Sequence, residues 1–144
     1  HVEAICRQIK RPVMTVSDDF KAPKSVLVAF DGGKMTRRGI ELLAAYPNMR
    51  DLPIHVIMLG KRSNESARQL EWAERVLTDA SFDVNATFIA GDPEQVVTRA
   101  IAEREADLLI MGAYSHSPWR SLLLGSRTND LLRASQVPTI TLHL

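Results

Sequence analysis

Hydrophobic residues along this chain form two alternating patterns. Short apolar runs rich in Val, Ile and Leu are typical of strands buried in a sheet. Longer segments carry apolar residues at helical spacing, which indicates helices with one face toward a core. The expected strands cover residues 25–30, 53–59, 83–90, 108–111 and 138–142, and the expected helices lie between them, the last at 126–135. The sequence thus predicts five strands in alternation with four helices.

Turn and helix signals separate these elements. A turn at residues 31–33 closes the first strand, and Pro47 stops the helix that follows it. Asp92 is placed as the N-cap of a later helix, with Pro93 at its first position and Gln95 placed for a capping box.

Alternation of this kind requires right-handed crossovers, which produce a mostly parallel sheet with helices on both faces. We therefore predict an α/β fold, Rossmann-like or flavodoxin-like, with a five-stranded, mostly parallel sheet flanked by helices. The expected strand order is 3-2-1-4-5, and ligands are expected at the carboxyl ends of the strands.

The start of the chain does not fit this domain, and a comparison of the chain with itself explains it. When Pro12 is aligned with Pro138, an offset of 126 residues, Arg7 falls on Arg133. Helix, proline and strand therefore occur twice, about a domain length apart. The alternative is chance similarity between two amphipathic segments.

The repeat predicts how the chain is divided. Residues 1–16 are expected to be the terminal helix and strand of a preceding repeat, 17–24 a linker, and 25–144 one complete domain. Within the first segment, residues 13–16 are expected to form a strand that pairs with a sheet edge at 139–142, because an edge strand leaves backbone groups unpaired.

Composition narrows the classes of protein. A chain of 144 residues is about one domain long, and 45% hydrophobic residues suffice for an ordinary packed core. A net charge of +1 provides no general attraction for nucleic acid or an anionic membrane. The single cysteine, Cys6, excludes an intrachain disulfide, and no zinc-type spacing accompanies it, so no metal site is predicted.

Targeting signals are also missing from the sequence. No apolar run is long enough to span a bilayer, and the first residues lack the layout of a signal peptide. The expected location is the cytoplasm.

The loop after the fourth expected strand is a candidate phosphate site. The strand ends at Gly112, a Ser-rich loop follows, and Gly125 and Ser126 begin the last helix. Glycine lets backbone N–H groups approach an anion, and a helix N-terminus offers unpaired donors at the positive end of its dipole. The alternative is purely structural: Gly112 ends a strand, Gly125 breaks a loop and Ser126 is an N-cap.

Other phosphate and catalytic motifs are absent from the sequence. A P-loop ending near Lys61 would need an upstream glycine and a final Ser or Thr, but His55 and Arg62 stand at those positions. No Gly-x-Gly-x-x-Gly follows an expected strand. His116 lies in the loop, but no nucleophile and base can be placed together, so no catalytic residue is assigned.

The chain resembles the universal stress protein family across residues 24–143. The resemblance rests on the strand that ends in Asp31-Gly32, the long helix, Gly91-Asp92-Pro93, Leu109-Ile110-Met111-Gly112, Gly125-Ser126 and a terminal Val137-Pro138 strand. Because residues 1–16 are similar to the end of a first such domain, the chain looks like the carboxyl-terminal half of a tandem universal stress protein.

The family's nucleotide-binding signature is Gly, two residues, Gly, nine residues, Gly, then Ser or Thr. This chain has Gly112, Ser115, Gly125 and Ser126 at those positions, so the spacing is kept and the second glycine is replaced. If position 115 requires a positive φ, a side chain there costs about 1–2 kcal/mol. If it does not, the Ser115 hydroxyl can donate a hydrogen bond to phosphate.

The resemblance implies roles for further residues. Asp31 matches an acidic residue near the nucleotide, and Leu59 matches an apolar residue that contacts the base. Arg127 and Arg120 flank the loop and are placed for charge-assisted contacts with phosphate. The structural alternatives are a turn-forming Asp, a core Leu and solvated arginines. Trp119, within the loop, is a candidate lid or interface anchor.

The resemblance implies a regulatory module of the stress response that binds ATP, with Mg²⁺ as its companion ion. It also implies a homodimer, or packing against a tandem partner domain, through terminal strands, and at most slow ATP hydrolysis. The alternative is an interaction or dimerisation module whose degenerate phosphate loop binds no nucleotide. A third candidate, a nucleotide hydrolase, is disfavoured because no general base is evident.

Overall fold

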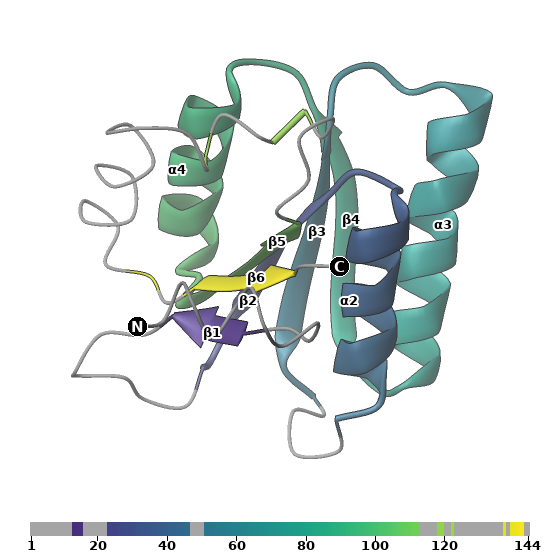
Figure 1. Ribbon diagram of the computed structural model, residues 1–144, viewed down its shortest axis with the longest axis vertical. Helices are drawn as coiled ribbons and strands as arrows, with labels where there is room; N and C mark the ends of the chain where they lie inside the picture. The colour runs from purple at the N-terminus through teal and green to yellow at the C-terminus, as the bar shows by residue number, and fades with distance from the viewer. Residues whose placement is uncertain are drawn as a thin grey trace.

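The chain folds around a six-stranded sheet with the strand order β1-β6-β5-β2-β3-β4 (Figure 1). This computed structural model describes residues 13–15, 23–46, 51–112, 118–119, 122, 137 and 139–142. Its strands are β1 (Val13–Thr15), β2 (Val26–Phe30), β3 (Pro53–Leu59), β4 (Asp83–Ile89), β5 (Leu108–Gly112) and β6 (Thr139–Leu142). The helices within the described residues are α2 (Lys34–Ala44), α3 (Asn64–Asp79) and α4 (Pro93–Arg104).

The predicted α/β architecture, a parallel sheet flanked by helices, is confirmed. The four central strands β4-β3-β2-β5 are all parallel and follow the order 3-2-1-4 expected for them. β6 lies beside β5, again in parallel, and β1 lies antiparallel to β6. The sheet therefore has six strands, one more than the five expected for the domain, because β1, from the strand expected at 13–16, adds backbone hydrogen bonds to an edge that would otherwise be open.

Two apolar clusters hold the layers together. Figure 1 shows α2 and α3 on one face of the sheet and α4 on the other. Alternate residues of β2 serve the two faces, since side chains of a strand alternate. Val28 and Phe30 pack with Ile40 of α2 in one cluster, whereas Leu27 and Ala29 belong to the other. All five residues of β2 are buried, which explains why this central strand reads as a continuous apolar run.

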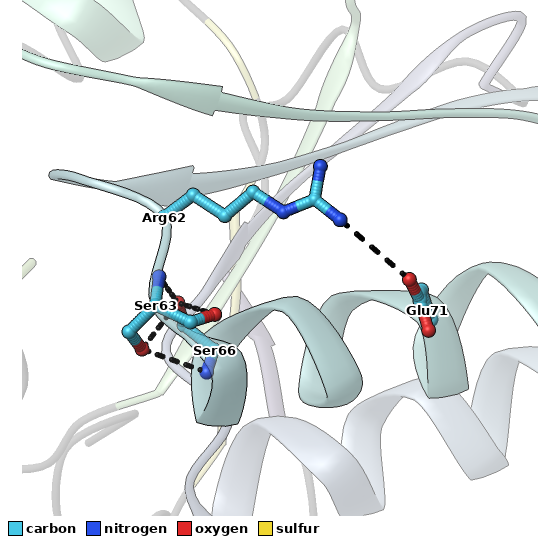
Figure 2. A network of polar contacts seen from close by, with 4 residues as sticks. All are labelled: Arg62, Ser63, Ser66 and Glu71. Carbon is cyan, nitrogen blue, oxygen red and sulfur yellow. Dashed lines mark hydrogen bonds and ion pairs between the residues drawn. The ribbon is translucent and has the colours of Figure 1, made fainter.

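The helix starts are capped by short polar side chains. At α3, Ser63 and Ser66 form a capping box in which Ser63 Oγ accepts the Ser66 N–H at 3.1 Å and Ser66 Oγ accepts the Ser63 N–H at 2.8 Å (Figure 2). At α4, the Asp92 carboxylate accepts the Gln95 N–H at 3.2 Å, as expected for an N-cap. Each such cap is worth about 1 kcal/mol.

The predicted terminal strand is confirmed, and it pairs within the same chain. The expected strand at 13–16 is observed as β1, and its central residue, Met14, lies opposite Ile140 of β6. The expected helix at 126–135, the helix before Pro12 and most of the expected linker at 17–24 lie outside the described residues.

Candidate functional site

Three of the residues singled out from the sequence lie at one edge of the sheet. Asp31 follows β2, Leu59 ends β3 and Gly112 ends β5. The strand order places β2 between β3 and β5, and all three strands are parallel. Their carboxyl ends therefore meet, which is the place where α/β sheets bind ligands.

Asp31 forms the turn that leads into α2. Its Oδ1 accepts the Gly33 N–H at 2.7 Å and the Thr36 hydroxyl at 2.5 Å. Thr36 is only 1% exposed, so its hydroxyl requires an internal partner. The turn-forming role left open by the sequence is thus present, and Thr36 is a contributor that sequence reasoning missed. Its signal was a polar residue on an otherwise apolar helix face.

The backbone of this turn requires glycine at one position. Gly32 has φ of +74°, a conformation that costs a residue with a side chain about 1–2 kcal/mol. A Cβ atom there would also lie 2.2 Å from Gln69 Oε1, since Gln69 of α3 covers the turn. The turn that follows Asp31 is therefore packed against Gln69 of α3 at Gly32.

Leu59 and Gly112 both have structural roles at this edge. Leu59 is half-buried and packs against the apolar cluster on the α4 side. A Cβ on the buried Gly112 would lie 3.2 Å from Thr36 Cγ2, tighter than an ordinary contact, so its small size lets α2 approach β5. Both residues have these packing roles and also lie at the carboxyl edge of the sheet.

The remaining predicted site residues, Ser115, Gly125, Ser126 and Arg127, lie outside the described residues, as does Arg120. The described part of the loop after β5 includes Trp119, which is 1% exposed and donates its Nε1–H to the Phe30 carbonyl at 2.9 Å. Trp119 was a candidate lid or interface anchor, but the ring is part of the core, so the interface-anchor interpretation is wrong and the ring is no exposed lid.

The described residues line at least two cavities. One of about 510 Å³ lies at the start of α3, beyond the end of β3. Its lining residues are Arg62, Ser63, Asn64, Ala67, Arg68 and Glu71. Arg62 and Glu71 approach each other across it at 3.9 Å (Figure 2), a separation at which exposed ion pairs contribute little. It contains no residue predicted for the site.

The larger cavity, of about 590 Å³, lies at the amino ends of the strands, on the edge opposite to Asp31. His55 lines it from β3, with Nε2 placed 2.9 Å from Thr87 Oγ1. His55 Nδ1 is buried, and no described residue provides it with a hydrogen-bond partner. Burial, and next to it the charge of Arg104, lowers the pKa of His55 from 6.5 to about 4. The imidazole is therefore neutral at pH 7.

Neither a metal centre nor a membrane span was found in the described part of the chain. Its His, Cys, Asp and Glu side chains form no group of three or more suited to a metal ion. Its helices are also too short or too polar to cross a bilayer.

Comparisons with known proteins agree on one family. The model of the Universal stress protein family matches residues 58–143. A universal stress protein of Synechocystis sp. is 32% identical over 143 residues, covering 98% of this chain and 50% of that protein. One of Methanocaldococcus jannaschii is 25% identical over 81 residues, covering 56% of this chain and 50% of that protein. The chain thus spans about half the length of these two curated relatives.

Solved structures share the fold. A universal stress protein in complex with cAMP matches with a TM-score of 0.64 and 21% identity over 85% of this chain and 98% of that one. A universal stress protein family protein from Arabidopsis thaliana with AMP bound matches with a TM-score of 0.59 and 18% identity, over 83% of this chain and 91% of that one. The universal stress protein from Archaeoglobus fulgidus in complex with dAMP matches with a TM-score of 0.58 and 17% identity, over 81% of this chain and 95% of that one.

Proposed function

Because this chain belongs to the universal stress protein family, we propose that it is a regulatory module of the stress response that binds an adenine nucleotide, ATP, at the carboxyl edge of its sheet. One observation carries the proposal: β3, β2 and β5 are neighbours, so Leu59, Asp31 and Gly112 converge at one edge. Structures with the same fold carry cAMP, dAMP and AMP, which supports an adenine nucleotide as the ligand class.

Each of the three residues has a chemical use in such a site. One carboxylate oxygen of Asp31 already accepts two hydrogen bonds within its own turn. Its other oxygen has no hydrogen-bond partner among the described residues and can accept from a ribose hydroxyl or an adenine amino group. The half-buried Leu59 offers apolar surface to the base. Gly112 begins the loop whose backbone N–H groups, together with Gly125 and Ser126, would face the phosphates.

Mg²⁺ would accompany the nucleotide. Mg²⁺ is commonly held by substrate phosphates and water with only one or two carboxylates, and Asp31 is a carboxylate at this edge. The ion would contribute charge neutralisation at the phosphates, whereas Asp31 and the loop would orient the nucleotide.

The experiment that tests the proposal is mass spectrometry of the small molecules released when the purified protein is denatured, with calorimetric titration of ATP into protein stripped of them. An adenine nucleotide in near-equal amount to the protein, and binding of ATP but not GTP, is the expected result. If nothing is released and ATP produces no heat, the alternative of a pure interaction module is correct. Phosphate release that depends on Asp31 would instead indicate a hydrolase.

We expect Ser115→Gly to weaken ATP binding by about tenfold, or about 1.4 kcal/mol. The retention of Gly112, Gly125 and Ser126 favours a working site in which the Ser115 hydroxyl donates to phosphate. A hydrogen bond to a charged acceptor is worth about 1.5–3 kcal/mol. Calorimetric titration of both proteins checks this, with Ser121→Gly as the control substitution in the same loop. Tighter binding by the variant would mean that the side chain had been obstructing the loop.

The tandem or dimeric arrangement is supported by the register of β1 and β6. Under the offset of 126 residues that relates the two ends of the chain, Met14 corresponds to Ile140, and the structure pairs these two residues directly. Antiparallel pairing centred on equivalent residues has the symmetry of a two-fold axis. The symmetry supports the proposal that β1 is the terminal strand of a preceding repeat and that two domains pack through such strands.

A fragment of residues 25–144 is expected to dimerise more strongly than the whole chain, because removal of β1 opens the outer side of β6. Light scattering over a concentration series measures both proteins. A fragment that stays monomeric at concentrations where the fold is intact would contradict association through β6.

A further inference from the structure

The loop after β5 contributes a large side chain to the core. Trp119 is the largest fully buried side chain among the described residues. It belongs to the apolar cluster on the α4 side, together with Leu27, Met111 and Leu122. The Leu122 N–H donates to the Trp119 carbonyl at 3.0 Å. This part of the loop is therefore attached to the sheet.

The indole nitrogen fixes where the ring is attached. Its N–H donates to the carbonyl of Phe30 at 2.9 Å. The ladder between β2 and β5 ends one residue earlier, at the Ala29–Met111 pair. The accepting carbonyl belongs to the peptide unit that joins Phe30 to Asp31. The loop is thus bonded directly to the backbone that carries Asp31.

Apolar packing alone would not require this bond. A Leu or Phe could fill the same cluster, but a buried indole N–H left without an acceptor costs about 1–3 kcal/mol. The ring is therefore restricted to an orientation that satisfies packing and the hydrogen bond together.

We propose that Trp119 is a positioning residue for the nucleotide site. This proposal rests on the function proposed above. It fixes the described residues of the loop after β5, Trp119 and Leu122, relative to the backbone that carries Asp31. The site requires this because its polar groups come from two separate segments, one after β2 and one after β5. A ligand that spans both segments is bound tightly only when their separation is fixed before binding.

The first test is Trp119→Phe, which keeps an aromatic ring and removes the N–H donor. Its dissociation constant for ATP is expected to rise about tenfold in calorimetric titration, while circular dichroism and the unfolding midpoint report a folded protein. Trp72→Phe is the matched control, because Trp72 is half-buried on α3 and packs against the opposite apolar cluster. That variant should bind ATP like the parent. If the folded Trp119→Phe protein binds ATP with unchanged affinity, the indole only packs in the core and the proposal is wrong.

A second measurement leaves the loop intact. The chain has two tryptophans, so Trp72→Phe makes Trp119 the sole indole. Its emission maximum is expected to stay at the wavelength of a buried indole throughout an ATP titration that gives heat in calorimetry, because the ring is already fixed before binding. A red shift of the emission on binding would mean that the ring leaves the core, and would contradict the positioning role alone. No binding heat in the parent protein would instead refute the proposed function, and the positioning role with it.

Discussion

Replacing Gly125 by arginine is expected to lower the affinity for ATP by at least about 100-fold while the domain stays folded. Gly125 immediately precedes Ser126, where the last helix is expected to begin and to offer its free N–H groups to phosphate. A long side chain at this position would occupy the volume of the ligand. Calorimetric titration of ATP measures the loss, and circular dichroism reports the fold.

The control for this variant is Ala102→Arg. Ala102 is exposed on α4, so the substitution adds the same charge and side chain without touching the carboxyl edge of the sheet. It should bind ATP like the parent. Equal affinity in the Gly125 and Ala102 variants would remove Gly125 from the site, and a Gly125 variant that does not fold would show that the glycine is needed for the fold.

Acid is expected to destabilise the protein through His55, by up to about 3 kcal/mol. The pKa of His55 is about 4 in the folded protein and 6.5 in the reference state. Between these values the unfolded chain binds a proton that the folded protein does not. Stability from this group is therefore fully present above pH 6.5, declines as the pH falls toward 4, and declines no further below that.

Urea unfolding at a series of pH values checks the expectation. The parent should lose more free energy of unfolding between pH 7 and pH 4 than His55→Gln, whose amide can still bond to Thr87 but does not titrate. The difference between the two proteins is the contribution of His55. Parallel curves for both would mean that the imidazole gains its proton without unfolding, for example from water that enters the cavity at the amino edge.

Much of the fold follows from local patterns in the sequence. β2, β3 and β5 were predicted within one residue of their observed ends, because a strand buried on both faces needs an unbroken apolar run. The start of α4 was predicted from Asp92 and Pro93, since capping depends on residues adjacent in the chain. The edge proposed for the site followed from the alternation of strands and helices, which determines the direction of every parallel strand.

Contacts between distant segments were decided by the tertiary structure. Nothing local to Trp119 indicates that its indole bonds to Phe30, which lies 89 residues earlier in the chain. Likewise, the sequence left Asp31 as either a turn former or a ligand, and the structure gave one of its oxygens to Gly33 and Thr36. The repeat predicted a terminal strand, but its pairing with β6 within the chain depended on how the whole sheet is assembled. The physical reason is that local patterns determine which residues must be buried, whereas a buried polar group takes whichever partner the packed fold brings within hydrogen-bond distance.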